Sequence, residues 1–429
     1  MYLFLLAMIM GMDNALLSPP TANSLPTNSI TVQRYIGSQG FSEITDWQYF
    51  DEDNKNVAPP PFDPRSPKRT VESSGSVVRL FSGVIAGVEG QKRRSRGEDI
   101  RVLIKEFDSS LRKVAANEAS VLTQLESENS NNNKFFVPLL GRWEALASDF
   151  DKNEWFRYLK TAPPLDGVEF LVFEYAGLAT VGTLATPPEL RRSRMPPKRG
   201  FLGPAPPPNL PPFQQRASYT IAIIRQALSA VASLHEAGFT HNSISSSSIV
   251  LNSVGQDKNE ASGIYAVDGS RLKVMLGNLG FASRTGEFDA GLRARAKIAG
   301  VDETSTLALS QWAIAEDLFN LGFSFLELVL GNLATGVEIV AIDASTLQRQ
   351  FDIMDNDFEG FRDYVGEGMG FEEAIRFLGE GEAEGGGGGW LFLSTLLLAR
   401  ESVAKNINSK SGELKFLTAR ALMSMRFLN

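Results

Sequence analysis

The sequence predicts an α+β protein in which a sheet-rich part precedes a helix-rich part. Between about residues 76 and 177 the apolar residues occur in short, strand-like runs, and from about residue 217 they occur in long runs with helical spacing. Of the 429 residues, 43% are apolar, so the chain can form a large core. We expect an N-terminal extension over residues 1–75 and a folded domain over residues 76–429, with its two parts at about 76–177 and 217–429.

The first part is expected to contain five strands and one helix. Valine, isoleucine, leucine and phenylalanine dominate the strand-like runs, which cover residues 77–81, 84–88, 100–107, 135–146 and 168–176. A Ser–Gly pair separates the first two runs and favours a turn there. Residues 113–127 have apolar side chains at helical spacing and predict a helix after the third strand.

The second part is expected to be mostly helical. Residues 218–238 predict a long apolar helix that ends at Gly238, with His235 in the last turn, where a cation is favoured. Two short strands are expected at residues 249–252 and 271–276, and helices over most of the remainder.

Composition excludes several classes of site. The chain has no Cys, so disulfides, thiolate metal sites and a cysteine nucleophile are excluded. It has two histidines, His235 and His241, too few for a histidine-rich metal centre. A net charge of −8 argues against a dedicated nucleic-acid binder.

The ends and inserts have their own compositions. Residues 1–12 are apolar but shorter than the roughly 20 residues that span a bilayer, so a targeting remnant and a buried segment both stay open. Residues 13–33 and 57–68 are typical of loops, and we expect no membrane-spanning segment. Residues 187–216, Pro-rich and basic, and residues 351–389, acidic and Gly-rich, predict two inserted surface loops that are candidate docking segments.

The order of these elements, with the residues at their joints, resembles the protein-kinase superfamily over residues 76–429. LIKEF at 103–107 is similar to the V-A-I-K motif, and ASLHEAGFTH at 232–241 to the entry of the catalytic loop. Residues 313–331 resemble the D-x-W-S-x-G-x-x-x-x-E-L helix, and residues 417–429 the end of the domain. The resemblance implies a two-lobed fold with a small β-rich N-lobe and a large helical C-lobe.

The resemblance also implies a nucleotide pocket between the lobes. Lys105 would pair with phosphates and with Glu118, for which Glu126 and Glu128 are alternatives. Asp317 would hold the catalytic-loop backbone, and Gly322 would allow close helix packing. The other candidate pocket residues are the hinge pair and two glycines, namely Glu174, Tyr175, Gly83 and Gly87.

Three departures from the kinase motifs decide the expected function. The H-R-D-x-x-x-x-N frame begins at His241 and places Ser243 at the catalytic aspartate and Ser248 at the metal-binding asparagine. The D-F-G frame places Asn278 at the second metal ligand. Mg²⁺ prefers anionic oxygen ligands, and an unperturbed serine is no general base. No A-P-E motif is present, and Gln311 to Ala313 come nearest to it, ahead of the expected helix.

The sequence therefore predicts a pseudokinase, a catalytically impaired kinase-like protein that acts in binding, as a scaffold or in regulation. The alternative is an ATP-binding Ser/Thr-type kinase with atypical catalytic residues, and a sensor that binds ATP without transferring phosphate lies between them. We expect no required cofactor, no metal site, and a protein partner at the inserts or C-lobe. For Lys105 and Glu118 two interpretations stay open: ATP binding without firm Mg²⁺ dependence, and a structural ion pair that sets the helix angle. The inserts resemble those of plant kinase-like proteins, some of them plastidial, so plastid and cytoplasm stay open.

Overall fold

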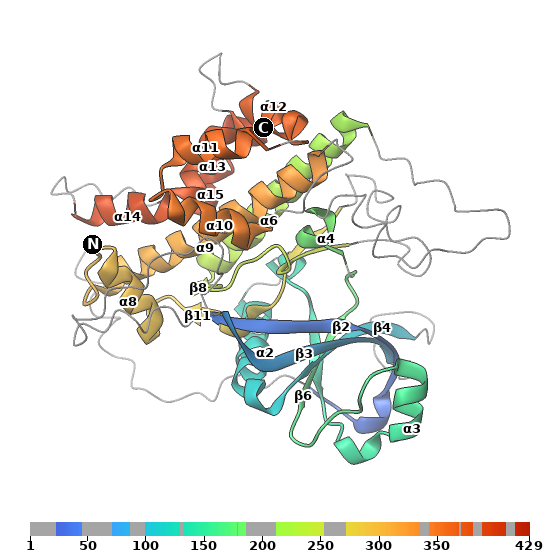
Figure 1. The fold of residues 1–429 in the computed structure, drawn as a ribbon. Coiled ribbons are helices and arrows are strands. Elements are labelled where there is room, and N and C mark those ends of the chain that lie inside the picture. The colour runs from blue at the N-terminus through green and yellow to red at the C-terminus, as the bar shows by residue number, and fades with distance from the viewer. Residues whose placement is uncertain are drawn as a thin grey trace, which may run out of the picture.

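The computed structural model combines a six-stranded sheet with a larger, mostly helical part that contains two small sheets (Figure 1). It describes residues 23–44, 71–85, 99–128, 132–177, 179–185, 212–252, 272–334, 343–368, 370–380, 388–408 and 417–429. The sheet comes first in the chain and the helices follow, so the predicted α+β class with a small β-rich lobe and a large helical lobe is confirmed.

The sheet has six strands in the order β1-β5-β6-β4-β3-β2. These strands are β1 Ser24–Leu25, β2 Ile30–Ile44, β3 Val71–Ile85, β4 Ile100–Phe107, β5 Leu139–Trp143 and β6 Glu169–Glu174. All neighbours are antiparallel except β1 and β5. The register aligns Gly37 with Leu80, Leu80 with Lys105, and Lys105 with Leu171, so one row of residues crosses four strands.

The start of the sheet differs from the prediction. Residues 77–81 and 84–88 do not form two strands around a turn: Ser82 and Gly83 lie inside the single strand β3. Its partner β2 lies in the segment expected to be an extension, and part of β2 in a segment expected to be a loop. A Cβ at Gly83 would come within 2.7 Å of the Thr31 carbonyl oxygen, so this glycine permits close approach of β2 and does not mark a turn. The expected features at residues 1–12 and 57–68 lie outside the described residues.

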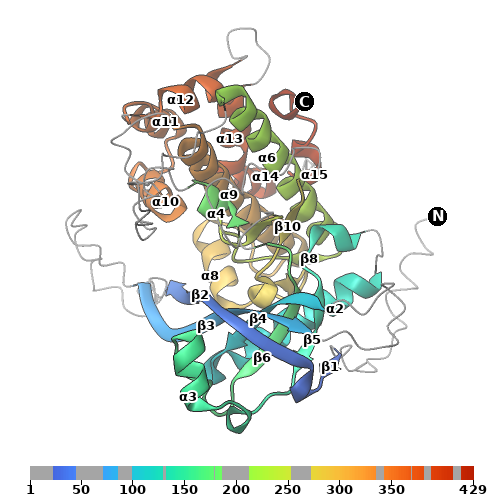
Figure 2. The ribbon, with the colours of Figure 1, turned by 90° about the vertical axis from the view of Figure 1, so that its right-hand side faces the viewer.

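Helix α2, Arg112–Glu128, packs beside the sheet, and its range agrees with the predicted helix (Figure 1). Apolar residues at helical spacing, among them Ala115, Ala119 and Leu122, are buried on one face. Between β5 and β6 a short helix α3, Lys152–Glu154, leads into a π-helical turn over Trp155–Leu159 (Figure 2).

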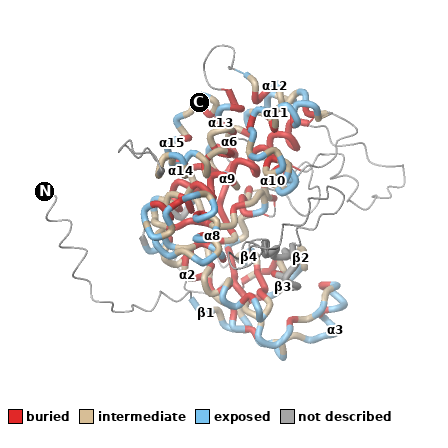
Figure 3. The backbone as a smooth tube through the Cα atoms, turned by 60° about the vertical axis from the view of Figure 1, so that its left-hand side comes forward, coloured by how far each residue is buried: buried red, intermediate tan, exposed pale blue. Residues whose placement is uncertain are grey.

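Helices α6, Phe213–Glu236, and α9, Thr306–Leu333, form the centre of the helical part (Figure 3). The helices around them are α4 Val181–Ala185, α8 Ala290–Ile298, α10 Ala344–Ile353, α11 Phe358–Gly366, α12 Glu372–Gly379, α13 Gly389–Leu397, α14 Ala399–Asn408 and α15 Ala419–Leu422. The short strands are β7 Ala179–Thr180, β8 Phe239–Thr240, β9 Ile249–Leu251, β10 Val274–Leu276 and β11 Ser283–Arg284. The 3₁₀ turns cover Thr27–Ser29, Ser109–Leu111, Asn132–Phe135, Ala147–Asp149, Leu279–Phe281 and Arg426–Leu428.

Two expectations about glycines in this part are confirmed. Gly238 follows α6 with a φ of 77°, the left-handed conformation typical of a glycine at a helix end. A Cβ at Gly322 would come within 2.8 Å of Leu397 Cδ2, so the absence of a side chain lets α9 approach α13 closely.

Among the described residues, α6 is the one helix whose length and mean hydropathy of 1.2 would suit a membrane span. The structure buries 67% of that stretch inside the protein, with Ile223, Leu228 and Leu234 in the core. This burial is typical of a core helix.

The described residues of the acidic insert predicted at residues 351–389 are mostly helical, which corrects its expected loop structure. It includes α11, α12 and the end of α10, and its described residues bury Phe351, Phe361 and Phe377 against the core. These side chains form the apolar face of the helices, which the high acidic content of the segment hid in the sequence. Residues 187–211 of the Pro-rich insert lie outside the described residues. The remaining residues are Pro212, which precedes α6, and the first turn of that helix.

Candidate functional site

A cavity of about 100 Å³ lies between the sheet and the strands β7, β9 and β10. Its apolar lining comes from β2, β3, β4, α2 and β6 on the sheet side and from β9 on the other side. The lining residues are Ile36, Leu80, Leu103, Lys105, Glu118, Leu122, Val137, Phe173, Ala176, Gly177, Thr180, Ser247, Val250, Gly277 and Asn278. This cavity brings together the two parts of the chain in which the sequence placed candidate residues.

Lys105 and Glu118 line this cavity and form a buried ion pair. Side chains alternate along β4, so Leu103 and Lys105 line the cavity while Ile104 packs on the opposite face of the sheet. The Lys105 Nζ donates to Glu118 Oε1 over 2.6 Å, and the two residues are 6% and 2% exposed. The predicted pair is therefore confirmed, and Glu126 is exposed on the same helix.

Asn278, from the helical part of the chain, is the third polar residue beside Lys105 and Glu118. It follows β10 with a φ of 60°, a left-handed conformation that asparagine tolerates better than most residues. Its Oδ1 accepts a hydrogen bond of 2.9 Å from Lys105 Nζ, and its Nδ2 donates to the Ser247 carbonyl over 3.4 Å. A neutral amide thus stands where the kinase frame has a metal-binding carboxylate.

Ser243 and Ser248 are absent from the cavity lining, whereas Ser247 belongs to it. The Ser248 hydroxyl lies 3.4 Å from the Ser243 carbonyl oxygen, to which it donates, and 3.1 Å from the Ser245 hydroxyl. The Ser248 hydroxyl is therefore hydrogen-bonded to other residues of its own loop.

His241 is fully buried at the start of this loop. Its Nε2 lies 3.0 Å from the Gly277 carbonyl oxygen, and the backbone N–H of Ser243 donates to its Nδ1 over 3.3 Å. Burial lowers the pKa of the imidazole, although the nearby charges of Asp317 and Glu118 oppose this effect. A neutral ring with Nε2–H directed at Gly277 agrees with both contacts.

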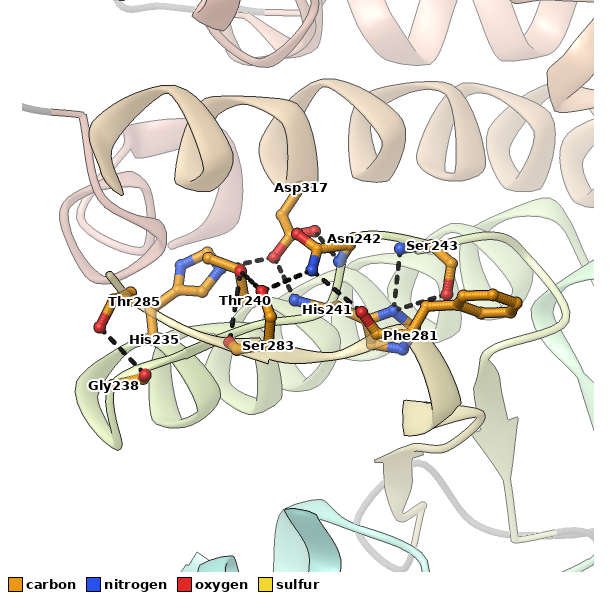
Figure 4. Close-up of polar contacts among 10 residues, drawn as sticks. All are labelled: His235, Gly238, Thr240, His241, Asn242, Ser243, Phe281, Ser283, Thr285 and Asp317. Atoms are coloured by element: carbon orange, nitrogen blue, oxygen red, sulfur yellow. Dashed lines mark hydrogen bonds and ion pairs between the residues drawn. The ribbon is translucent and has the colours of Figure 1, made fainter. Parts of the chain in front are cut away.

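Asp317 holds the backbone of the loop, as predicted (Figure 4). Its Oδ2 accepts the N–H of His241 over 2.7 Å, and its Oδ1 accepts the N–H of Asn242 over 2.8 Å. The ring of His235, from the last turn of α6, lies 3.0 Å from Oδ2. With 0% exposure, Asp317 connects α6, α9 and the loop through one carboxylate.

Two asparagines hold the segment that follows Asn278. Asn117 of α2 donates from Nδ2 to the carbonyl oxygens of Gly280 and Ala282, over 2.9 and 2.8 Å. Asn242 donates from Nδ2 to the Phe281 carbonyl oxygen over 3.0 Å and to the Ser283 hydroxyl over 2.9 Å (Figure 4). Each lobe therefore contributes one neutral amide to the same short segment.

The remaining candidate residues are placed differently from the prediction. The backbone N–H of Glu174 donates to the Pro138 carbonyl oxygen and that of Tyr175 to the Arg101 carbonyl oxygen, and the residues that line the cavity are the next two, Ala176 and Gly177. Gly83 lies inside β3 and outside the cavity lining, which corrects its assignment to a nucleotide loop. Gly87 lies outside the described residues.

Ile36, which lines the cavity, and Gly37 beside it were not among the predicted site residues. A signal was present: residues 37–44 read GSQGFSEI, which matches the G-x-G-x-x-G-x-V frame at Gly37 but has Gln39 and Ser42 at the other two glycines. The glycine frame therefore belongs to β2 and not to residues 82–90.

The region without A-P-E also differs from the prediction. Gln311 to Ala313 lie inside α9 and do not precede it. One turn later, Glu316 accepts two hydrogen bonds from the Arg295 guanidinium of α8, over 2.9 and 2.7 Å, and lies 3.9 Å from Arg400. Glu316 is therefore an acidic anchor for this region, and it was not among the predicted residues.

The donor set of the cavity does not fit Mg²⁺. The carboxylate that lines it, Glu118, is paired with Lys105, and Asn278 supplies no charge. Among the residues that the structure describes, no three His, Cys, Asp or Glu side chains form a group suited to a metal ion.

No protein-family model matches the sequence, and no curated protein matches it. Solved structures do match the fold. One is the crystal structure of an Stt7 homolog from Micromonas algae soaked with ATP, which is 15% identical with a TM-score of 0.45. The match covers 82% of this chain and 88% of that one.

Proposed function

We propose that the chain is a kinase-shaped binding or regulatory protein that lacks phosphotransferase activity. One observation carries this proposal: the three positions at which the kinase frame needs a base and two metal ligands hold Ser243, Ser248 and Asn278, all uncharged. Phosphoryl transfer depends on positioned charge and on Mg²⁺ between the phosphates, and a positioned base alone contributes about 10²–10⁴-fold.

The contacts of these residues support the same proposal. Asn278 accepts from Lys105, and Ser248 donates to the backbone of Ser243, so both are occupied inside the protein. The ion pair of Lys105 with Glu118 sets the position of α2 against the sheet, which is a structural role open to a protein without catalysis.

A phosphotransfer assay tests the proposal. The full chain is incubated with radiolabelled ATP, Mg²⁺ or Mn²⁺, and casein or myelin basic protein. We expect no transfer above that of a Lys105→Met variant. Transfer by the wild-type chain that is lost in both Lys105→Met and Asn278→Ala would overturn the proposal and establish the alternative, an ATP-binding kinase with atypical residues.

A restored variant makes a negative result informative. Ser243→Asp, Ser248→Asn and Asn278→Asp together return the missing groups to their frame positions. Activity in this triple variant, with none in the wild type, would assign the loss to these three residues and not to the substrates chosen.

A protein partner is the second element of the proposal. We place its contact on the inserts or on the C-lobe, where the described helices α11 and α12 present acidic side chains such as Glu359, Asp363 and Glu372 to solvent. A pull-down with the full chain as bait, compared with one that uses a chain lacking residues 187–211, tests whether the Pro-rich insert is the contact. Equal capture by both chains would exclude that insert as the contact.

A further inference from the structure

The cavity has no net charge of its own to offer a ligand. Lys105 and Glu118 cancel each other across 2.6 Å, and Asn278 is neutral. An ammonium group has three N–H donors. Glu118 and Asn278 accept two of them, and Nζ lies 4.8 Å from the centre of the Phe173 ring. One N–H is thus left without an oxygen acceptor among the described residues.

Most of the remaining lining residues are apolar, and Thr180 and Ser247 are the polar ones among them. Leu103 and Leu80 come from neighbouring strands of the sheet, and Val250 comes from β9 on the other side of the cavity. Such walls favour a ring system with apolar faces, because its burial removes apolar surface from water on both sides.

The cavity is also small. At about 100 Å³ it is below the range of about 300–1,000 Å³ that is typical for drug-sized ligands. It is nearer the roughly 150 Å³ of an apolar cavity that accommodates one benzene ring. Leu103 contributes to this size, because the V-A-I-K frame has alanine at its position.

We propose that this cavity binds a small, neutral, flat aromatic heterocycle through one acceptor atom to Lys105, without phosphates and without a metal ion, and that Leu103 limits the size of the ligand. A triphosphate would bring several negative charges to a site with one already paired cation and no metal-binding carboxylate to spare, and uncompensated charge is costly to bury. The inference rests on the proposed function, since it takes the site as one that does not hold Mg²⁺-bound ATP for transfer.

Adenine is a suitable neutral probe, and ATP is its charged counterpart. Thermal shift and isothermal titration calorimetry on the full chain would measure binding of adenine, of ATP, and of ATP with Mg²⁺. We expect adenine to raise the melting temperature, and ATP to bind more weakly whether or not Mg²⁺ is present. Tighter binding of Mg²⁺-ATP than of adenine, or no binding of adenine, would overturn the inference.

Variants of β4 test the size limit. Leu103→Ala should enlarge the cavity and raise the affinity for adenosine, the larger neutral probe, by about tenfold or more. Val102→Ala is the matched control, because Val102 is buried on the opposite face of the same strand and does not line the cavity. If Leu103→Ala does not fold, Leu103→Phe fills the cavity instead and should abolish adenine binding. An unchanged affinity in the variant that folds would overturn the role of Leu103.

The two proposals fail in different ways. Phosphate transfer by the wild-type chain overturns the proposed function, whatever adenine does. Loss of the adenine result, with no transfer detected, overturns the ligand inference and leaves the proposed function in place.

Discussion

The two walls of the cavity differ in the charges that they retain. On the sheet side, Lys105 and Glu118 form the ion pair that the kinase frame leads one to expect. On the loop side, Asn278 lines the cavity without a charge, and Ser243 and Ser248 of the neighbouring loop are uncharged as well. Asp317 still holds the backbone of that loop by accepting two N–H hydrogen bonds. The charged side chains that are retained are buried and hydrogen-bonded to other groups inside the protein.

This difference teaches that fold and chemistry depend on different residues of the same site. A buried carboxylate such as Asp317 satisfies donors that would otherwise be unpaired, so its loss would cost stability. A catalytic aspartate or a metal ligand acts on bound groups and contributes little to holding the loop. Uncharged residues at those positions are therefore compatible with an intact loop.

The largest expected effect is that of removing the loop anchor. Asp317→Ala should lower the free energy of unfolding by about 3–5 kcal/mol, because it leaves the N–H groups of His241 and Asn242 and the ring of His235 without their acceptor. Urea unfolding followed by circular dichroism measures it. Asp363→Ala, at an exposed helix position, should change stability by less than about 0.5 kcal/mol. Equal effects of the two variants would contradict the anchor role.

The sheet wall is tested next. Lys105→Met should cost about 2–3 kcal/mol, because Glu118 is left buried without its partner. The double variant Lys105→Met/Glu118→Leu should recover most of that loss, since both charges are then removed. A double variant as unstable as the sum of the two single variants would show that the residues act independently and not as a pair.

The contact between the walls depends on Asn117. Asn117→Ala removes two hydrogen bonds to Gly280 and Ala282 and should cost about 1–2 kcal/mol. We expect faster hydrogen exchange in residues 279–285 of this variant. Glu126→Ala, exposed on the same helix, is the control and should leave exchange in that segment unchanged.

The smallest expected effect is the pH dependence of the loop. Burial lowers the pKa of His241 in the folded protein below the value of about 6.5 of an exposed histidine. The unfolded chain then binds more protons than the folded protein, so stability should fall as the pH drops below about 6.5. His241→Gln should lose less stability than the wild type between pH 7.5 and pH 5.5 in urea unfolding. An identical loss in both proteins would assign the pH dependence to other groups.

Much of the fold could be predicted because its signals are local. The ranges of β4 and α2 follow from period-two and helical spacing over a few turns, and Lys105, Glu118 and Asp317 were found from short motif frames. The glycine frame at Gly37 is also local. It was missed because residues 77–88 read as two strands around a turn, whereas residues 77–85 lie in one strand whose partner comes far earlier in the chain.

The acidic insert shows the same limit. Its charge and its glycines are typical of a loop, but Phe351, Phe361 and Phe377 are buried between helices. That burial depends on packing partners outside the segment, and the composition of the segment gives no information about those partners.

The sequence by itself determined which groups occupy the catalytic frame, because residue identity is a property of the chain: Ser243, Ser248 and Asn278 carry no charge in any fold. Only the tertiary structure decided how those groups are used. In the tertiary structure Glu118, and not Glu126, pairs with Lys105, Asn278 accepts a hydrogen bond from that same lysine, and Leu103 lines the cavity. These outcomes depend on distances between residues far apart in the chain, which strand register and helix packing establish.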